Sequence, residues 1–333
     1  MKTVGVVGAS GFLGSELVRL LLSHPMVALT YLGGQFSAGK RLADIRPGFS
    51  HCPDLVISEV CPETIARSCE TVFLALPHGE SAAVAQPLLD LGVTIIDLGS
   101  DFRLSDPSAV DLYYKRPAPS QQLLDQAIYC LPELTGAPPR DTKLIAVPGC
   151  FATGLNLLVA GLHGIADLVH IFGITGSSGS GISPSAGVHH SLRPTNFLAY
   201  KSLNHQHEGE VRQLLRKQNR AIDFTFVPHS APMVRGIHLT TVVKATAEVV
   251  EASLRRLYAN QTCIIIEPGP APVGSVIGTN LVRLGFESDG DFTAVFCAMD
   301  NLLKGGSGQA VQIFNLLNNF PETEGLPLIA AWP

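Results

Sequence analysis

The chain has 333 residues, which is more than one ordinary hydrophobic core accommodates and indicates about two domains. Hydrophobic residues make up 46% of the chain and charged residues 15%, so it can bury large cores, as a globular α/β enzyme does. The formal net charge of −5 excludes a general attraction to nucleic acid or to an anionic membrane, and we therefore expect a small-molecule substrate.

The cysteines are odd in number and scattered, without a CxxC pair or the spacing of metal ligands. This usage predicts a reduced, cytoplasmic chain with no metal site. Residues 1–8 lack the apolar core of a signal peptide, and no run reaches the roughly eighteen apolar residues of a membrane-spanning helix. We expect a soluble protein with no membrane partner. The cysteines are Cys52, Cys61, Cys69, Cys130, Cys150, Cys263 and Cys297.

A glycine-rich turn at residues 8–14 follows an apolar stretch at residues 3–7 and precedes a helical pattern of leucines. A strand, a turn and a helix in this order are typical of dinucleotide binding, because glycines let the backbone approach a pyrophosphate at the helix N-terminus. The pattern is GxxGxxG rather than GxGxxG, and a purely structural turn is the alternative. The expected cofactor contacts are Gly8, Ser10, Gly11, Phe12, Leu13 and Gly14.

The second expected strand, residues 27–32, ends in a loop at residues 33–41 that contains no acidic residue. An enzyme specific for NAD usually places an acid here to bind the ribose 2′-hydroxyl. Ser37, Lys40 and Arg41 instead offer a hydroxyl and two cations to a 2′-phosphate. The loop therefore predicts NADP (NADPH) as the cofactor, with an ordinary solvated loop as the alternative.

Two further strands are expected at residues 71–76 and 93–97, separated by a helix around residues 80–91. In a doubly wound sheet the carboxyl ends of such strands line the cofactor crevice. The loops at residues 77–79 and 99–103 occupy these ends and should contact cofactor or substrate.

Within these loops Pro77 is the candidate for cofactor contact. His78 and Asp101 are either direct contacts or loop caps, and the residue types alone do not separate the two. Residues 111–143 contain five prolines and are expected to be rich in loops.

Residues 144–154 begin as an apolar stretch, pass through Pro148 and Gly149, and deliver Cys150 to the start of a helical pattern. A cysteine at such a corner lies among unpaired backbone N–H groups at the positive end of a helix dipole, which favours the thiolate. We predict that Cys150 is a nucleophile. The alternative is a buried cysteine that acts as a small hydrophobic side chain.

After Cys150 no second nucleotide fingerprint occurs, which indicates a separate catalytic domain. A strand expected at residues 171–175 leads into a glycine and serine loop at residues 176–181. The backbone N–H groups of this loop, with Ser177 and Gly179 as candidates, predict an anion-binding nest for cofactor or acyl-phosphate oxygens. A flexible loop is the alternative.

His205 and His207 precede Glu210 at the expected start of a helix. The separation of His207 and Glu210 lets a carboxylate orient an imidazole within one helical turn, as a general base requires. Metal binding is the weaker alternative, because two histidines at i and i+2 lack a third ligand of clear spacing. A further alternative is that these histidines are ordinary exposed side chains at the start of a helix.

Two later stretches carry the remaining candidates. Residues 224–237 predict a strand and an irregular turn with Arg235, whose guanidinium can bind a carboxylate or phosphate through two hydrogen bonds. Residues 300–312 run from a loop into a helix that should pack back on the first domain. Asn301 and Gly305 in that loop are candidates for cofactor contact.

These motifs follow one another in an order that a known family shares. They lie at residues 8–14, 148–153, 205–210, 232–237 and 300–312. The chain resembles the N-acetyl-γ-glutamyl-phosphate reductase family, including its branch that acts on carrier-protein-linked glutamyl or aminoadipyl phosphate in arginine and lysine synthesis. The resemblance spans nearly the whole chain.

The resemblance implies an α/β fold like those of glyceraldehyde-3-phosphate and aspartate-semialdehyde dehydrogenases. Residues 1–149 with 305–333 would form an N-terminal Rossmann domain that binds NADP. Residues 150–304 would form an α+β domain for catalysis and dimerisation. A homodimer or homotetramer is implied as well.

The resemblance also implies the chemistry. The Cys150 thiolate attacks an acyl phosphate, and NADPH reduces the resulting thioester to a semialdehyde. His207 exchanges the proton, with Glu210 behind it. The residues expected to hold the anionic groups of the substrate are His205, Arg235 and Arg193.

Other functions stay open at this point. The chain could act on another acyl phosphate, as aspartate-semialdehyde dehydrogenases do, or could be an alcohol or hydroxy-acid dehydrogenase without a covalent thiol. A non-catalytic NADP or redox sensor is a third alternative, which would not need the cluster of His205, His207 and Glu210.

The acyl substrate can be either free or carrier-linked. The loop at residues 176–182 and the following His189 and His190 look more like the carrier-linked branch, whose substrate arrives on an acidic protein and needs a basic approach. We expect a higher kcat/KM with carrier-linked substrate, reduced by salt, although a solvated helix face explains the same charges. The basic residues are Arg193, Lys201, Arg212, Arg216, Lys217 and Arg220.

Overall fold

The computed structural model describes residues 1–52, 55–184, 189 and 191–331. The chain divides into two compact units, Met1–Pro148 with Gly306–Leu326 and Gly149–Gly305 with the chain from Pro327 onward. The expected division differs in its last residues, because it assigned all of 305–333 to the first domain. The carbonyl of Pro327 instead accepts a 2.9 Å hydrogen bond from the Asn280 amide of the second unit.

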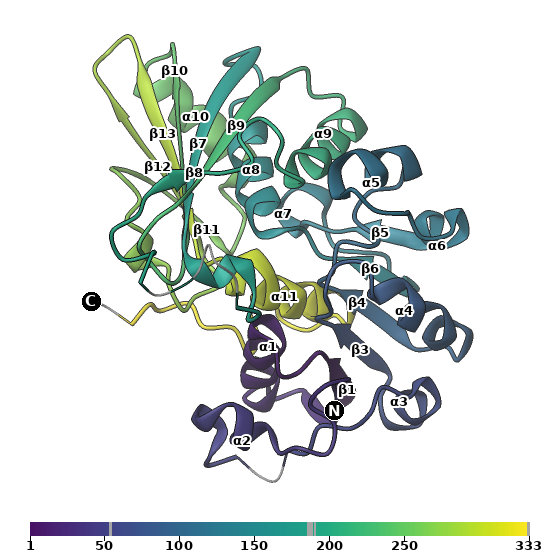
Figure 1. Ribbon diagram of the computed structural model, residues 1–333. Helices are drawn as coiled ribbons and strands as arrows, with labels where there is room; N and C mark the ends of the chain where they lie inside the picture. The colour runs from purple at the N-terminus through teal and green to yellow at the C-terminus, as the bar shows by residue number, and fades with distance from the viewer. Residues whose placement is uncertain (53–54, 185–188, 190, 332–333) are drawn as a thin grey trace. The chain divides into compact units, whose positions relative to one another are not determined.

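The first unit is built on a parallel sheet of six strands within the described residues, in the order β2-β1-β3-β4-β6-β5 (Figure 1). Its central strands are buried on both faces, which explains why they are continuous apolar runs rather than alternating ones. The strands expected from the sequence are confirmed. The six are β1 (Lys2–Val7), β2 (Val27–Gly33), β3 (Thr71–Leu74), β4 (Thr94–Asp97), β5 (Ala127–Tyr129) and β6 (Leu144–Ala146).

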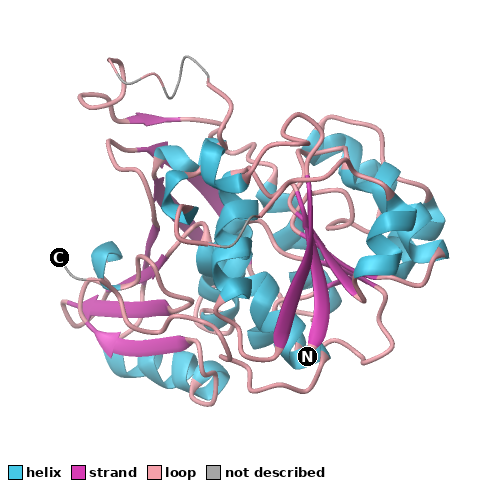
Figure 2. Ribbon diagram, turned by 90° about the horizontal axis from the view of Figure 1, so that it is seen from below, coloured by secondary structure: helices cyan, strands magenta, loops and turns pink. Residues whose placement is uncertain are grey.

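Helices accompany this sheet (Figure 2). Helix α1 buries Leu17, Leu20 and Leu21, as its spacing of leucines predicts, and α11 packs against α1 and β4. The C-terminal helix therefore returns to the first unit. The helices are α1 (Phe12–Leu22), α2 (Leu42–Ile45), α3 (Pro62–Ser68), α4 (Ser81–Asp90), α5 (Pro107–Tyr114), α6 (Gln121–Gln126), α7 (Pro132–Thr135) and α11 (Gly308–Leu317), with a 3-10 turn η1 (Pro47–Phe49).

Residues 111–143, which are expected to be rich in loops, contain regular elements between their loops. This stretch holds the end of α5, then α6, β5 and α7. Pro132 stands in the first turn of α7, where its missing N–H costs nothing, and Ser120 caps α6 with its side chain. Pro132 thus begins a helix, whereas Pro117, Pro119, Pro138 and Pro139 lie in the loops.

The second unit is built on a mixed sheet of seven strands in the described part of the chain, in the order β11-β12-β13-β10-β7-β9-β8. Exposure alternates along β7, with Leu168 and Phe172 outside and Val169 and Ile171 inside, so one face of the sheet is packed and the other is open. The strands are β7 (Leu168–Thr175), β8 (Leu198–Ala199), β9 (Asp223–Ser230), β10 (Ile237–Val243), β11 (Ile264–Pro268), β12 (Val282–Ser288) and β13 (Thr293–Met299).

Helix α8 lies against the packed face of this sheet, in contact with β10 and β13. Gly154 permits the approach, because a Cβ there would lie 3.0 Å from a methyl group of Leu239. Among the described residues, no helix is both long and apolar enough to cross a membrane. The helices of this unit are α8 (Cys150–Gly161), α9 (His207–Lys217) and α10 (Ala247–Tyr258), with short turns η2 (Ser177–Ser180), η4 (Val273–Ser275) and η5 (Leu303–Ser307), the last a π-helix.

Candidate active site

The turn between β1 and α1 requires glycine at two positions. Gly8 has a φ of +87°, and a Cβ there would collide with the carbonyl oxygen of Ala75. A Cβ on Gly14 would collide with the carbonyl oxygen of Gly8. Gly11 is the N-cap of α1 and supplies no capping side chain to the first amides of the helix. This open helix start fits a pyrophosphate, which is the group that the sequence predicts here.

Two serines connect this turn with the loop after β2. Ser37 is buried, and its Oγ lies 3.1 Å from the Oγ of Ser10. The amide of Gly8 donates a 2.8 Å hydrogen bond to the carbonyl of Gly33, at the end of β2. The structure therefore brings Ser10 and Ser37 together, and their contact with the cofactor stays a prediction.

The cations near this loop differ from those expected. Arg41 is paired with Asp44 at 2.7 Å, which weakens its candidacy as a phosphate ligand, while Lys40 is exposed. Arg46 was missed. Its guanidinium donates a 2.5 Å hydrogen bond to the carbonyl oxygen of Ser10 and lies 5.8 Å from the ring centre of Phe12. No spacing rule in the sequence indicates this contact, because it joins residues 36 positions apart.

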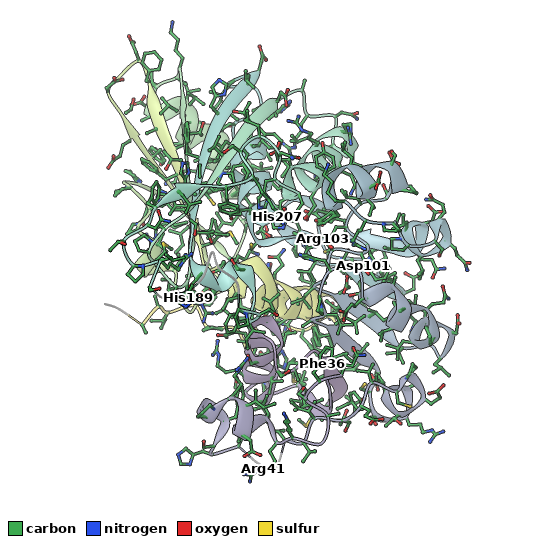
Figure 3. All side chains as sticks on the ribbon, viewed as in Figure 1. Phe36, Arg41, Asp101, Arg103, His189 and His207 are labelled. Carbon is green, nitrogen blue, oxygen red and sulfur yellow. The ribbon has the colours of Figure 1, made fainter. Side chains whose placement is uncertain are left out.

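The loops at the carboxyl ends of β3 and β4 are held by buried charges (Figure 3). Asp101 accepts hydrogen bonds from the amides of Gly79 and Ala82, at 2.8 and 3.0 Å, and pairs with Arg116 at 2.9 Å. The cap interpretation is therefore confirmed for Asp101. Arg103 donates to the carbonyls of Leu98 and Val147, which makes it a structural clamp. The role of Pro77 in cofactor binding stays a prediction.

Asp97 ends β4 and is fully buried. Burial raises the pKa of its carboxyl from the ordinary value of 3.8 to about 7, although a hydrogen bond from Ser81 opposes this rise. The group is therefore partly protonated at neutral pH. It lies beside the loop that Asp101 organises.

Cys150 is the first residue of α8, directly after the N-cap Gly149. The expected position at a helix start is thus present, and the thiol is half-buried rather than part of the core. Gly305 lies against it, since a Cβ on Gly305 would be 2.8 Å from the Cβ of Cys150. The predicted residues Cys150 and Gly305 are therefore in contact.

Glu210 is fully buried in the first turns of α9, and its Oε2 accepts a 2.9 Å hydrogen bond from the backbone amide of Gly149. The carboxylate thus contacts the turn that presents the thiol. The sequence spacing predicts only that the carboxylate of Glu210 orients the imidazole of His207. The hydrogen bond to Gly149 is an additional contact, which holds the turn before Cys150.

The two histidines occupy different environments. His205 is buried, with Phe151 at 5.5 Å and Phe226 at 5.6 Å between ring centres, and its Nδ1 accepts a 3.2 Å hydrogen bond from the amide of His207. Burial lowers the pKa of His205 from 6.5 to about 3, with a smaller effect of Lys201. The imidazole is therefore neutral, and the role of His205 in holding an anionic group of the substrate stays a prediction.

His207, labelled in Figure 3, is the first residue of α9. Its ring centre lies 4.7 Å from that of His205. Glu208 orders this helix start, because its carboxylate accepts a 3.0 Å hydrogen bond from the amide of His205. Phe151 follows Cys150 in the chain and packs on His205. The second unit thus brings the thiol, both histidines and Glu210 into one cluster.

Tyr200 belongs to the same cluster and was missed. Its ring lies 6.0 Å from that of His205, edge to face. Burial and the charge of Cys150 raise the pKa of the Tyr200 hydroxyl, so it stays protonated at neutral pH. Its position five residues before His205 is a weak signal, because an isolated tyrosine in a loop carries no motif.

Arg235 is held by a buried carboxylate. Asp300 Oδ2 accepts hydrogen bonds from Nε of Arg235 at 2.6 Å and from the amide of Gly278 at 2.7 Å. Asn301 accepts a 2.7 Å hydrogen bond from the amide of Gly236. The amide of Gly305 donates to the carbonyl of Asp300 at 2.9 Å, which links this group to the segment packed on Cys150. Asp300 was missed as the partner that orients Arg235.

Arg193 has a structural contact set. Its guanidinium donates to the Oγ of Ser230 at 2.7 Å and to the carbonyls of Ala231 and Met233 at 2.6 and 3.2 Å. These bonds clamp the end of β9, so the expected substrate role has less support. His189 lies 2.8 Å from Ser191 through its Nδ1, and His190 lies outside the described residues.

The glycine and serine loop is not an open nest. The amides of Ser177 and Ser178 donate to the carbonyls of Met233 and Val234, and those of Gly179 and Gly181 bond within the loop. These four amides are therefore not available to an anion, and cofactor contact by Ser177 and Gly179 stays a prediction. The hydroxyl of Ser178 accepts from the side-chain amide of Asn301 at 3.0 Å, so Asn301 braces this loop as well.

Two protein-family models match the chain. The NAD binding domain of semialdehyde dehydrogenases matches residues 3–140, and the semialdehyde dehydrogenase dimerisation domain matches residues 150–301. Among curated proteins, the N-acetyl-gamma-glutamyl-phosphate reductase of Pseudomonas fluorescens (strain Pf0-1) is 39% identical over 98% of both chains. The protein of the same name from Methanopyrus kandleri is 38% identical, again over 98% of both.

Solved structures with the same fold are more distant in sequence. Aspartate semialdehyde dehydrogenase II of Vibrio cholerae, complexed with ASA, has a TM-score of 0.71 at 16% identity and covers 96% of this chain and 98% of its own. The Candida albicans aspartate semialdehyde dehydrogenase with NADP has a TM-score of 0.68 at 17% identity, with the same coverage. The expected fold is confirmed.

Proposed function

Because this chain belongs to the N-acetyl-γ-glutamyl-phosphate reductase family of semialdehyde dehydrogenases, we propose that it reduces N-acetyl-γ-glutamyl phosphate to the semialdehyde with NADPH, releasing phosphate. The observation that carries the proposal is the cluster around Cys150. A thiol at a helix start, a histidine pair and a buried carboxylate bonded to the adjacent turn are the groups that a covalent acyl mechanism requires.

The chain's own residues make and break a thioester. The Sγ of Cys150 attacks the acyl carbon, the bond from that carbon to the phosphate oxygen breaks, and the oxygen leaves with the electron pair. His207 delivers a proton from solvent to the departing phosphate. When bound, NADPH supplies the hydride that reduces the thioester carbonyl. The carbon–sulfur bond then breaks, which yields the aldehyde and restores the thiolate.

Two further residues stabilise charge in this scheme. The protonated hydroxyl of Tyr200 donates a hydrogen bond to the carbonyl oxygen as it becomes negative. Arg235, oriented by Asp300, binds an anionic group of the substrate. Arg193 contributes less to substrate binding in this scheme, because its guanidinium is engaged by Ser230 and Ala231.

A preference for NADPH over NADH is part of the proposal. The paired hydroxyls of Ser10 and Ser37, with Lys40 and Arg46 nearby in the chain, suit a 2′-phosphate. Equal kcat/KM for the two cofactors would contradict this preference.

The free acetylated substrate is favoured over a carrier-linked one. The two curated relatives described above carry the N-acetyl name. Arg212 is engaged by Asp223 at 2.5 Å, and the ring centre of Phe224 lies 4.7 Å from its guanidinium carbon. Such engagement leaves fewer of the basic residues for docking an acidic carrier protein. The expected advantage of a carrier-linked substrate stays a prediction, with less support than the sequence suggested.

A homodimer is proposed through the open face of the second sheet. Leu168, Phe172 and Val242 are 49%, 53% and 57% exposed on β7 and β10, and the register places Phe172 opposite Thr240, two residues from Val242 on the same face. The family description of residues 150–301 as a dimerisation domain supports an interface in this unit. Light scattering on the wild type and on Phe172→Asp tests the dimer, which the variant should dissociate.

A cytoplasmic location is part of the proposal. No disulfide joins any of the seven cysteines, and the proposed nucleophile must stay reduced to attack an acyl phosphate. Location of a tagged chain in cells is the direct measurement.

The central experiment measures NADPH oxidation with N-acetyl-γ-glutamyl phosphate, and the reverse reaction with phosphate, NADP and the semialdehyde. Cys150→Ala should abolish both while NADPH still binds. Cys61→Ala removes a thiol in the first unit and should leave the rate unchanged. Wild-type protein that binds NADPH without turnover would indicate a sensor, and activity retained in Cys150→Ala would indicate a dehydrogenase without a covalent thiol. A matched carrier-linked aldehyde decides between the two substrates.

A further inference from the structure

A cavity of about 540 Å³ lies in the first unit, at the amino ends of its parallel strands. Its lining includes Lys2, Thr71 and Thr94, which are the first residues of β1, β3 and β4. The glycine turn and the loops after β3 and β4 follow the carboxyl ends of the same strands. About 13 Å of strand separates the two ends of the four-residue β3. The cavity is therefore separate from the predicted cofactor contacts.

Positive charge is concentrated in the lining of this cavity. Four of its sixteen residues are lysine or arginine and one is acidic, whereas the whole chain has 23 basic and 28 acidic residues. The basic residues come from β1, from the last turn of α3 and from the loop before β6, so they meet here although they lie far apart in the sequence. The four are Lys2, Arg67, Arg140 and Lys143, and the acid is Glu70.

Contacts within the protein neutralise only part of this charge. Lys2 pairs with Glu70 at 2.7 Å, and Glu70 is the single carboxylate of the lining. Lys143 donates a 3.0 Å hydrogen bond to the carbonyl of Gly92, and Arg140 donates a 2.9 Å bond to a side-chain amide oxygen. These two acceptors are neutral, so they satisfy hydrogen bonds without cancelling the charges of Lys143 and Arg140.

Helix ends offset a further part of the charge. Helices α3, α4 and α11 end at the cavity, because the residues that follow them, Cys69, Leu91 and Asn318, belong to its lining. The C-terminus of a helix carries at most about half a negative elementary charge, so the three ends and Glu70 together offset about two and a half of the four positive charges. A surplus of about one and a half positive charges is left, which suits a ligand with about two negative charges.

The size and polarity of the cavity define the ligand further. Its volume equals that of roughly eighteen water molecules at about 30 Å³ each, so it has room for a molecule larger than a phosphate ion. Thr3 and Thr94 add hydroxyl groups, which can bind phosphate or carboxylate oxygens. A small molecule that carries one phosphate group or two carboxylates meets both requirements.

We propose that this cavity binds a small dianionic metabolite, whose phosphate or carboxylate oxygens contact Arg67, Arg140 and Lys143. The site is separate from the proposed cofactor and substrate sites, and the inference does not depend on the proposed function. Because the cofactor loops follow the opposite ends of the strands, the dianion and NADPH should bind at the same time.

The test titrates the protein with glucose 6-phosphate and, separately, with malate, each without NADPH and at saturating NADPH. The wild type should bind at least one of them at one site per chain, equally well in both conditions and less tightly as salt is added. Glucose lacks the phosphate, so it is the neutral control and should not bind. The tighter ligand of the two shows whether phosphate or carboxylate is the recognised group.

Variants locate the binding site. Arg67→Gln and Lys143→Gln should each weaken binding roughly ten-fold, as loss of a hydrogen bond between charged groups does. Glu70→Gln removes the opposing carboxylate and should strengthen binding, a gain that damage to the fold does not produce. Lys217→Gln, which changes an exposed cation in the last turn of α9, is the matched control and should leave the affinity unchanged.

Three results would overturn the proposal. The first is the absence of saturable binding of both anions by the wild type. The second is wild-type affinity in Arg67→Gln and Lys143→Gln, which would place the bound anion elsewhere. The third is displacement of the anion by NADPH, which would place it among the predicted cofactor contacts. The proposed reductase activity stands or falls separately, because the turnover assay measures it without these ligands.

Discussion

Glu210 binds the backbone amide of Gly149 through its Oε2 at 2.9 Å, directly before Cys150. Both groups are buried, and a hydrogen bond from an amide to a carboxylate is stronger than one between neutral groups. The bond joins α9, which begins with His207, to the turn from which α8 begins. One side chain therefore holds the histidine helix and the thiol turn together.

Glu210→Ala should both destabilise the protein and lower kcat. The variant leaves the Gly149 amide without this acceptor, at a cost of about 1–3 kcal/mol. Glu210→Gln keeps an acceptor oxygen, so it should retain most of the stability and lose part of kcat. Thermal unfolding and turnover are measured together, with Glu251→Gln as control, since Glu251 is a partly exposed residue of α10 outside the cluster. If Glu210→Ala unfolds at the same temperature as the wild type, the hydrogen bond between Glu210 and Gly149 does not contribute to stability.

His207→Asn should lower kcat about 10²- to 10⁴-fold, as expected for loss of a proton-transfer group, with little change in NADPH affinity. The pH–rate profile of the variant should lose one ionisation. His205→Asn should act mainly on stability, because that ring is buried among Phe151 and Phe226. If His205→Asn instead abolishes the pH dependence, the two roles are reversed.

His205 should make the protein less stable in mild acid. Its folded pKa of about 3 lies below the ordinary 6.5, because burial disfavours the charged ring, so the unfolded chain binds more protons between these values. This contribution to stability is complete above pH 6.5 and is lost as pH falls toward 3, by about 1.4 kcal/mol per pH unit. Urea unfolding of wild type and His205→Gln between pH 7 and 5 measures it. If the unfolding free energies of the two proteins change in parallel with pH, the lowered pKa of His205 is contradicted.

Asp97 should have the opposite pH dependence. Its folded pKa of about 7 lies above 3.8, so the folded state binds the extra proton, and its stabilisation is present below pH 3.8 and lost as pH rises through about 7. Asp97→Asn is neutral at every pH and can still accept from Ser81, so its stability relative to wild type should rise from pH 4 to pH 7. The exposed Asp90→Asn should show no such trend. A constant difference in unfolding free energy across this range would be the contrary result.

Gly305→Ala should disturb the thiol without removing it. The added Cβ would lie 2.8 Å from the Cβ of Cys150, 3.2 Å from its Cα and 3.1 Å from the methyl group of Met299, so backbone must move. We expect kcat to fall at least about ten-fold and the rate of thiol alkylation to change. Gly48→Ala, which meets no atom within 4 Å, serves as control. Wild-type kinetics in Gly305→Ala would show that the backbone around residue 305 accommodates the methyl group without displacing Cys150.

Local chemistry explains what the sequence alone determined. The strand, glycine turn and helix at residues 2–22 depend on backbone freedom at Gly8 and on apolar spacing, both of which adjacent residues set. Cys150 at a helix start follows in the same way from Pro148 and Gly149. Motif order then indicated the family, because each motif reports a local geometry that the chemistry requires.

Contacts between distant residues are what only the tertiary structure decided. Arg46 reaches Ser10, Asp300 orients Arg235, and the carbonyls of Met233 and Val234 occupy amides that a glycine-rich loop would otherwise offer to an anion. Burial likewise made His205 neutral, although its sequence neighbours are polar. Hydrogen-bond partners and solvation depend on which segments fold side by side, and the spacing of residues along the chain does not record that.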